Sequence, residues 1–272
     1  MEAMREKQIE LLNCFISLCE QLELNWFCVC GTALGAVKYN GYIPWDDDID
    51  VAMPREDYDK FVENAAAWLP EYFFLQNYRS DPAFPHEFSK LRNSETTQLE
   101  LGVQYLNMNH GIYIDIFPLD GYPNSKVGKI KFELQNKVLT WKQFCFVKDN
   151  PKRRIRIRNL LFRLMGYHKK IHQVMMQKEQ LYKKFPLNQS TYWCNYGNWQ
   201  GKLEYAPKWH YGEGTWAIFE GLRVRIPENY DAYLTQKYGD WRSDPPKEKQ
   251  RSHHISAVVD AERPSTYYIN ND

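Results

Sequence analysis

The sequence predicts an α+β fold in which a mixed β-sheet is flanked by helices and a helical subdomain is inserted after the sheet. As far as residue 123, short apolar runs of strand type alternate with segments whose apolar residues recur every three or four positions. From about residue 126 to residue 185 the pattern is helical, with interruptions at Asn150-Pro151 and near Gly166. This order of elements is typical of a sheet with helices packed on it, followed by two or three inserted helices.

The predicted sheet lies within the first 123 residues. Residues 5–24 are expected to form an amphipathic helix. A strand then ends at Gly31-Thr32, where a second helix begins with Thr32 near its cap, and Pro54 opens a third helix through about residue 67. The predicted strands are short apolar runs at residues 26–30, 49–53, 73–76, 88–92 and 111–117, the last of them broken by the segment 118–123.

The chain divides into three predicted parts, which are residues 1–123, 124–188 and 189–272. In the third part, residues 190–216 are loop-like and rich in aromatic residues, and a strand at 222–226 and a helix at 230–238 follow. The tail after Arg263 is expected to be poorly ordered, as chain ends often are.

Composition and charge exclude several classes of protein. With 43% hydrophobic and 25% charged residues, the chain of 272 residues is expected to fold rather than to be disordered. A net charge of +1 gives no reason to expect nucleic-acid binding. No apolar run approaches about 18 residues, so no segment is expected to span a membrane. The six Cys lack zinc spacing and are expected to be reduced, which fits a cytoplasmic protein.

An acidic strand is the strongest functional signal. Four Asp occur within residues 46–50, and Asp48 and Asp50 share one face of the predicted strand. A third carboxylate, Asp115, lies inside the apolar run Ile112–Phe117, where a charge must be neutralised, paired or ligated. If the two strands are neighbours, the three carboxylates form a site suited to Mg²⁺ or Mn²⁺.

Alternatives remain for each carboxylate. The acidic run could be a solvated turn that precedes a strand, and Asp115 could cap a loop. Asp120, in Pro118-Leu119-Asp120-Gly121, is interpreted as a turn residue.

Several residues are candidates for binding phosphate. Gly31 and Thr32 lie at a helix start, where backbone N–H groups bind phosphate, although an ordinary strand-to-helix turn is the alternative. Lys90 and Arg92 alternate onto one strand face and could neutralise a diphosphate, or could be a solvated pair on an edge strand. His253 and His254, with Arg251 as a weaker candidate, could hydrogen-bond phosphate or nucleotide, or could be surface residues.

Two further patterns admit a functional and a structural interpretation. A set of aromatic residues could form a cage for a cation or stack on sugars, or could be a minor core. The set comprises Trp193, Tyr196, Trp199, Tyr205, Trp209, Tyr211 and Trp216. A basic run, made of Arg153, Arg154, Arg156 and Arg158, could contact anionic lipid at the inner face of the plasma membrane, or could be a solvated helix face. Trp45 is expected to pack the loop that presents the carboxylates.

The longer motifs resemble the LicD family, which has a nucleotidyltransferase-like fold. A strand that ends in Gly-Thr, an Asp-x-Asp on the next strand and a third Asp on a later strand are typical of that fold. The runs that closely resemble the family are Gly31–Val37, Gly41–Asp50, Met53–Tyr58, Tyr113–Asp120, Phe219–Gly221, Tyr238–Trp241, Pro245-Pro246 and His253-His254. The resemblance spans about residues 10 to 260 and is weakest in the helical middle.

The resemblance implies a magnesium-dependent phosphotransferase. LicD proteins transfer phosphocholine from CDP-choline to teichoic acid or lipopolysaccharide, and the related fukutin group transfers ribitol phosphate from CDP-ribitol. It therefore implies a CDP-linked donor, a hydroxyl of a cell-surface glycan such as teichoic acid, lipopolysaccharide or capsule as acceptor, and CMP as leaving group. It also implies that Asp48, Asp50 and Asp115 hold Mg²⁺ or Mn²⁺ in a catalytic core at residues 1–123, with residues 189–272 completing the cleft.

Two other functions stay open. A nucleotidyltransferase would use CTP and release diphosphate, whereas a non-catalytic protein of envelope assembly would bind a divalent cation without turnover. The transferred group could be the phosphate of choline, ethanolamine, ribitol or glycerol, and choline is the favoured one.

Overall fold

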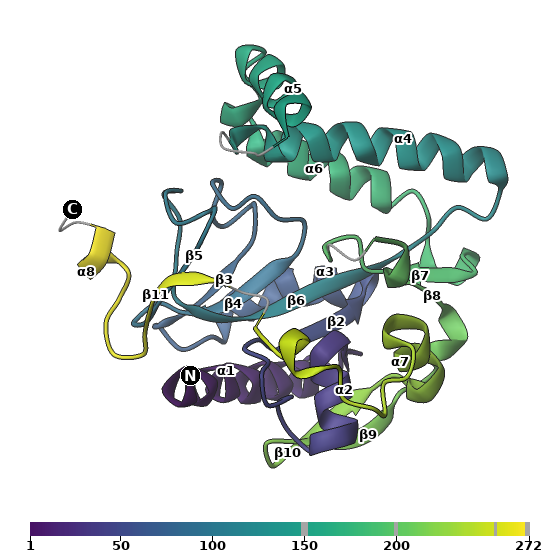
Figure 1. Cartoon of the computed structure of the whole chain (residues 1–272). Coiled ribbons are helices and arrows are strands. Elements are labelled where there is room, and N and C mark those ends of the chain that lie inside the picture. The colour runs from purple at the N-terminus through teal and green to yellow at the C-terminus, as the bar shows by residue number, and fades with distance from the viewer. Residues whose placement is uncertain (148–151, 199–200, 253–254, 270–272) are drawn as a thin grey trace.

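The computed structural model describes residues 1–147, 152–198, 201–252 and 255–269. A central sheet of seven strands contains the order β1-β2-β6-β4-β3, with β7 paired to β6 and β8 paired to β7 (Figure 1). Its strands are β1 (Phe27–Cys28), β2 (Asp50–Pro54), β3 (Phe73–Gln76), β4 (Ser89–Asn93), β6 (Ile112–Gly121), β7 (Tyr192–Cys194) and β8 (Tyr205–Pro207).

Two smaller sheets adjoin the central one. A hairpin pairs β9 (Thr215–Phe219) with β10 (Leu222–Ile226), and β5 (Thr97–Glu100) pairs with β11 (Ser256–Asp260), which is far away in sequence. Since β5 lies between β4 and β6 in the chain, its pairing with β11 brings the C-terminal segment back to the N-terminal half of the molecule.

The helices form two groups (Figure 1). One group packs around the central sheet, and the other stands above it as a separate layer, in which α4 packs against α6 and α5 packs on α4. The first group is α1 (Glu2–Gln21), α2 (Cys30–Tyr39), α3 (Arg55–Asn64) and α7 (Tyr230–Tyr238), and the second is α4 (Lys126–Gln143), α5 (Arg153–Leu164) and α6 (Ile171–Tyr182). A short helix, α8 (Thr266–Ile269), lies near the C-terminus.

Short 3-10 turns connect these elements. They are η1 (Ala65–Ala67), η2 (Phe144–Phe146), η3 (Tyr167–Lys169), η4 (Leu187–Gln189), η5 (Gly201–Glu204), η6 (Lys208–His210) and η7 (Lys247–Lys249).

The main core lies between α1 and the central sheet. Leu11, Leu12 and Phe15 of α1 are fully buried, as are Val51 of β2 and Ile114 of β6. Burial of each such side chain stabilises the fold by about 1.5–3 kcal/mol. The apolar stripe of α1 therefore packs on the sheet whose strands β2 and β6, buried along nearly their whole length, carry Asp50 and Asp115.

The predicted fold class and most predicted elements are confirmed. β3, β10 and α7 have the predicted bounds, and the helical segment contains α4, α5 and α6. Strands β5, β7, β8, β9 and β11 are absent from the sequence-based prediction, and β7 and β8 lie in the segment 190–216, which the sequence predicts to be loop-like. The expected disorder after Arg263 is not what the described part of the tail shows, because α8 follows there.

The prediction that residues 118–123 break the last strand is wrong. β6 continues through Pro118 to Gly121. Its antiparallel neighbour β4 begins at Ser89, which lies opposite Ile116, so no residue of β4 pairs with Pro118. A residue without an N–H is therefore tolerated at this position of β6. Asp120 is consequently a buried strand residue rather than a turn residue, and its carboxylate accepts hydrogen bonds from Arg55 at 2.8 and 2.6 Å.

Candidate functional site

A cavity of about 1010 Å³ opens over the carboxylate-bearing strands. Its walls come from the start of α2, the strands β2, β4 and β6, the helices α4 and α6, and the C-terminal part after β7. The three parts predicted from the sequence thus all contribute to one cavity, which is large enough for a nucleotide-sized ligand.

Asp48, Asp50 and Asp115 all line this cavity. Strands β2 and β6 are parallel neighbours, and their register places Asp50 directly beside Asp115. The N–H of Asp115 donates to the carbonyl of Ile49 at 2.9 Å, which locks this register at the start of β2. Asp48 lies in the loop that leads into β2, which begins at Asp50, so the prediction that Asp48 and Asp50 share one face of a strand is wrong. The predicted neighbourhood of the two acidic strands is therefore present.

Helix α1 anchors the backbone of the acidic loop. Arg5 donates to the carbonyl of Asp46 at 2.6 Å, and Gln8 donates to the carbonyls of Asp47 at 2.9 Å and of Tyr113 at 3.3 Å. Gln8 thereby joins the acidic loop to β6, and its own side chain is held by the hydroxyl of Tyr42 at 2.9 Å. These bonds fix the loop without using its carboxylates.

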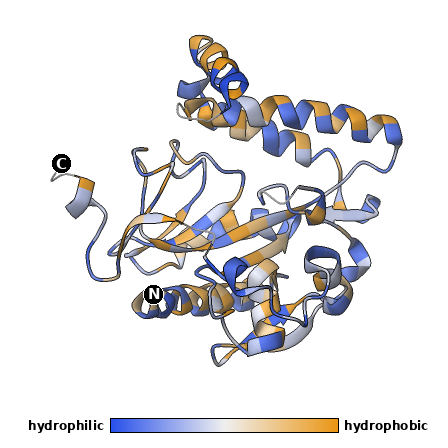
Figure 2. Cartoon of the chain, in the orientation of Figure 1, coloured by the Kyte–Doolittle hydropathy of each residue, from blue (hydrophilic) through white to orange (hydrophobic). Residues whose placement is uncertain are grey.

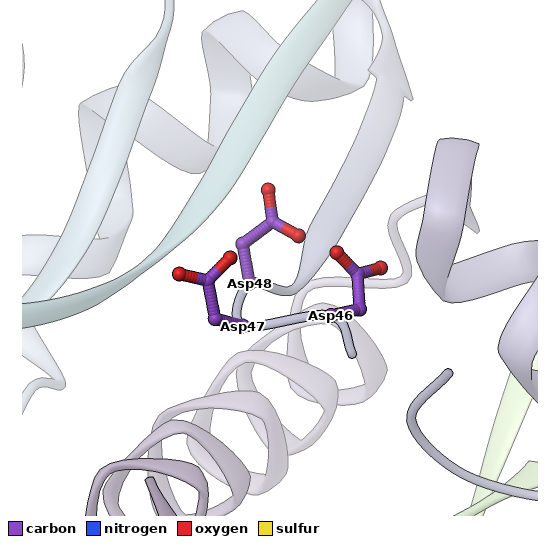
Figure 3. A group of neighbouring side chains, drawn as sticks. All are labelled: Asp46, Asp47 and Asp48. Carbon is purple, nitrogen blue, oxygen red and sulfur yellow. The ribbon is translucent and has the colours of Figure 1, made fainter. Parts of the chain in front are cut away.

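The neighbouring carboxylates Asp46, Asp47 and Asp48 lie close together (Figure 3). One oxygen of each lies within 4.8 Å of the others. Burial, the charge of Asp48 and a hydrogen bond with it raise the pKa of Asp46 to about 8. Asp47 differs from the other two, because it is buried and accepts a hydrogen bond from Ser252 at 2.5 Å, and it is not among the described residues that line the cavity.

The donor set fits a divalent cation. Asp48, Asp50 and Asp115 line one cavity and come from two adjacent strands and the loop before one of them. Oxygen ligands of this kind suit Mg²⁺ or Mn²⁺. Asp46 lines the same cavity, and its raised pKa reflects burial and the nearby charge of Asp48, which such an ion would balance.

Gly31 lines the cavity at the start of α2, as expected of a phosphate-binding glycine. A Cβ at this position would lie 2.3 Å from Oδ2 of Asp46. Glycine therefore allows the helix start and the acidic loop to approach closely.

Thr32 is placed differently from the prediction of a phosphate contact. It is 2% exposed, is not among the described residues that line the cavity, and lies within α2 rather than at its cap. Its Oγ1 accepts the N–H of Asp50 at 2.8 Å. Thr32 thus fixes the first residue of β2, which is one of the three carboxylates.

A Thr32→Val variant is expected to lose about 1–3 kcal/mol of unfolding free energy, because Val has the same shape but cannot accept the buried N–H of Asp50. Urea denaturation measures this loss. Thr32→Ser keeps the acceptor and should stay close to the parent. Equal stability of the Val variant and the parent would show that this hydrogen bond does not matter.

Lys90 and Arg92 share one face of β4, as predicted, since both contact Glu100 and the ring of Tyr113. Only Lys90 lines the cavity, with Nζ 3.4 Å from Oδ1 of Asp115 and 3.1 Å from Glu100. Arg92 is fully buried and donates to Gln76 at 2.5 Å and to the carbonyl of Gly111 at 2.6 Å. The position of Arg92 gives it a role in holding β3, β4 and β6 together rather than in contacting a diphosphate.

His253 and His254 lie outside the described residues. The adjacent Ser252 contacts Asp47, which places this end of the C-terminal segment beside the acidic loop. Arg251 is exposed and is not among the described residues of the cavity wall.

The predicted aromatic set does not form a single cage. Among its described members, Tyr196 and Tyr205 line the cavity, and Tyr196 also stacks on Tyr182 at 4.4 Å. Trp193 stacks on Tyr211 at 5.4 Å within the main core, and Trp209 and Trp216 are largely exposed. Trp199 lies outside the described residues. Trp45, expected to pack the acidic loop, lies on the cavity wall.

Glu100 and His86 are among the cavity residues that the sequence-based prediction does not include. Glu100 ends β5 and holds Lys90, Arg92 and the hydroxyl of Tyr113. Burial alone would raise the pKa of Glu100, but Lys90 and Arg92 lower it far below its usual range. His86, in the loop before β4, packs against Phe84 and Phe88. Both stand in segments with no clear periodicity, so the sequence offers little signal for them.

His86 should make stability depend on pH. Burial and the charge of Lys90 lower its pKa from 6.5 to about 4. Between about pH 6.5 and 4, His86 is therefore protonated in the unfolded chain but neutral in the folded chain. The unfolding free energy consequently decreases as the pH falls through this range, by at most about 1.4 kcal/mol per pH unit.

A His86→Phe variant isolates this contribution. Its unfolding free energy, relative to the parent, should rise as the pH falls from 7 to 5, and urea denaturation at several pH values measures the difference. Asp46 acts with the opposite sign between about pH 4 and 8, but it is present in both proteins and cancels. A difference that is independent of pH would contradict the assignment.

Comparison with known proteins agrees with the geometry. Residues 23–150 match the family described as LicD/FKTN/FKRP, nucleotidyltransferase domain. The chain is also similar to the lipopolysaccharide cholinephosphotransferase LicD of Haemophilus influenzae, with 32% identity over 270 aligned residues that cover 93% of this chain and 96% of the relative. The predicted family and the predicted enzyme class, a transferase, are confirmed. The chain belongs to the LicD family.

Proposed function

We propose that this protein transfers choline phosphate from CDP-choline to a hydroxyl of a cell-surface glycan such as lipopolysaccharide. The acceptor oxygen forms a new bond to the phosphorus that bears choline, the phosphorus–oxygen bond to CMP breaks, and the hydroxyl proton is released. CMP is the leaving group. The reaction requires Mg²⁺, which Mn²⁺ can replace.

The observation that supports the proposal is that Asp48, Asp50 and Asp115 all line one cavity, with Asp50 and Asp115 as register neighbours on β2 and β6. Similarity to a named cholinephosphotransferase over nearly the whole chain supports the choice of group and of acceptor. Teichoic acid and capsule are acceptors of the same chemistry, since each presents a glycan hydroxyl.

The chain's residues have distinct roles in the proposed reaction. Asp48, Asp50 and Asp115 would hold the metal ion, which when bound balances phosphate charge and lowers the pKa of a nearby hydroxyl. Asp115 is the carboxylate assigned to accept the hydroxyl proton. Lys90, whose Nζ lies beside Asp115, supplies a positive charge for the donor phosphates. Gly31, at the start of α2, lines the same cavity and is assigned to bind phosphate through its backbone N–H.

The wall near α4 and α6 offers groups for the choline end of the donor. Phe144, Tyr196 and Tyr205 line the cavity there. A quaternary ammonium binds to aromatic faces through cation–π attraction, whereas ribitol and glycerol carry no charge to exploit them. These rings favour choline over the alditols.

A cytoplasmic location belongs to the same proposal. All six cysteines are free, and they include pairs that are close in sequence, such as Cys28 and Cys30. Free thiols throughout are typical of a reducing compartment.

A second candidate is a nucleotidyltransferase that uses CTP and releases diphosphate. This candidate is supported by the description of the matched family, which names a nucleotidyltransferase domain. A divalent-cation-binding protein without catalysis is the third. The three differ in what they release from which donor.

A donor panel tests the proposal. The purified chain with Mg²⁺ is incubated with CDP-choline, CDP-ethanolamine, CDP-ribitol, CDP-glycerol or CTP, with and without lipopolysaccharide, and CMP and diphosphate are quantified. We expect CMP from CDP-choline, abolished by EDTA. Release of diphosphate from CTP would replace the proposal by the second candidate. CMP from another CDP-alcohol alone would change the transferred group, and no release with acceptor present would favour the non-catalytic protein.

A further inference from the structure

Helix α5 exposes an apolar face that nothing in the described structure covers. Five large apolar side chains on it are between 50% and 76% exposed. They are Ile157, Leu160, Leu161, Leu164 and Met165, which recur at intervals of three and four residues and so share one side of the helix. Figure 2 shows apolar and polar residues side by side along α5. A contiguous exposed face of this kind marks an interaction surface.

The opposite side of α5 packs on the rest of the helical subdomain. Asn159 is buried there, and its amide donates to the carbonyl of Val147 at 2.9 Å. Phe162 packs edge-on against Tyr167. The apolar face is therefore not the face that attaches α5 to the protein.

Arginines border the apolar face. By helical periodicity, Arg156 and Arg163 follow one edge of it and Arg158 the other, while Arg153 and Arg154 lie at its N-terminal end. Among the described residues, Arg153, Arg154 and Arg156 are exposed and form no ion pair. Residues 152–170 contain eight Lys and Arg and no Asp or Glu.

We propose that α5 is a membrane-surface helix that lies in the interface of an anionic lipid bilayer. Its five apolar side chains would enter the acyl boundary, and its arginines would contact lipid phosphates. The helix has 12 residues, and no helix in the described parts of the chain is long and apolar enough to cross a membrane. The helix is thus suited to lying on a bilayer rather than to spanning it.

Charge argues against a second copy of this chain as the occupant. A two-fold dimer through α5 would bring the same face of each helix together. The basic border, without an acidic residue from 152 to 170, would then face its own copy and repel it. An anionic bilayer complements both the apolar face and its border.

The position of α5 would bring the cavity close to a membrane that the helix binds. α5 packs on α4 and on the turn η2. Those two elements contribute Asn136, Thr140 and Phe144 to the cavity wall. An α5 bound to a bilayer would therefore hold the cavity close to a lipid-linked acceptor.

Vesicle sedimentation tests this inference. The full chain, without donor, is mixed with vesicles of phosphatidylglycerol and phosphatidylcholine or of phosphatidylcholine alone, at low and high salt. We expect binding to the anionic vesicles that weakens with salt. Leu161→Gln/Leu164→Gln, which keeps helix propensity, should lower the partition coefficient at least about tenfold. Arg153→Gln/Arg154→Gln/Arg156→Gln should lower it about a hundredfold at low salt and flatten the salt dependence.

Trp68→Gln/Ile218→Gln is the matched control, because it removes two exposed apolar side chains from other surfaces, and it should bind like the parent. Circular dichroism checks that every variant keeps its helices. Binding of the α5 variants equal to that of the parent would overturn the inference. So would a dimer of the parent in sedimentation velocity that Leu161→Gln/Leu164→Gln dissociates, since the occupant would then be a second copy. Neither result depends on the donor or on catalysis.

Discussion

Replacing Asp50 or Asp115 by Asn is expected to slow CMP release from CDP-choline at least about a hundredfold. The two carboxylates are side by side in register on β2 and β6, and each is less than 10% exposed. Asn has nearly the same shape but loses the charge that a divalent cation requires. Metal stabilisation of developing phosphate charge contributes several kcal/mol, and about 1.4 kcal/mol corresponds to a factor of ten in rate. Initial rates at saturating donor measure the effect.

Asp47→Asn is the matched control for this loss. Asp47 neighbours the site in sequence, but its carboxylate accepts from Ser252 and it is not among the described residues that line the cavity. Its activity should stay within a few-fold of the parent. If Asp47→Asn were as inactive as Asp50→Asn while Asp115→Asn remained active, the assignment of the three carboxylates would be wrong.

The second large effect concerns stability rather than activity. Asp120→Asn is expected to lower the unfolding free energy by about 3 kcal/mol, because it leaves the buried guanidinium of Arg55 with only its longer contact to the carboxylate of Asp59, at 3.5 Å. Arg55 and Asp120 form two hydrogen bonds, at 2.8 and 2.6 Å, that join α3 to β6. Urea denaturation at pH 7 measures the loss.

A double variant separates pairing from packing. Arg55→Met/Asp120→Leu removes both charges and fills the space with apolar groups, so it should recover much of the stability that Asp120→Asn loses. If the double variant were as unstable as the single one, the loss would come from shape and not from the unpaired charge. Asp120 is not among the described residues of the cavity wall, so the activity of any folded fraction should persist.

The sequence could predict the sheet that carries the site because its strands are short, apolar and well punctuated. Asp115 is recognisable because burying a charged residue inside the apolar run Ile112–Phe117 is costly unless the charge is balanced. Asp48 and Asp50 are recognisable because four Asp occur within residues 46–50. Periodicity alone also predicted two or three helices in the subdomain, where the structure has α4, α5 and α6. Local sequence patterns therefore predicted the elements whose buried face is determined by their own residues.

Other features depend on which strands meet, and the sequence does not contain that information locally. Pro118 looks like a strand breaker, yet β6 continues through it because the pairing with β4 reaches only as far as Ile116. Arg92 looks like a phosphate ligand, yet β3 and Gly111 enclose it. Thr32 faces Asp50 instead of the cavity because α2 begins two residues earlier than predicted, at Cys30.

The aromatic set shows the same limit in another form. Residues 193–216 are equally rich in Trp and Tyr along their length, so composition alone cannot separate them. With β7 paired to β6 and β8 paired to β7, Trp193 packs against the main core while Tyr205 lines the cavity. Only the tertiary arrangement decides which rings can touch a ligand.

The most direct test of the proposed metal site is Mn²⁺ binding to the purified chain, followed by electron paramagnetic resonance of the free ion. The parent is compared with Asp46→Asn, Asp47→Asn, Asp48→Asn, Asp50→Asn and Asp115→Asn. We predict that Asp48→Asn, Asp50→Asn and Asp115→Asn each weaken binding at least about tenfold, and that Asp47→Asn binds like the parent. Normal binding by Asp50→Asn and Asp115→Asn, with loss in Asp46→Asn and Asp47→Asn, would place the ion on the acidic loop alone and contradict the account.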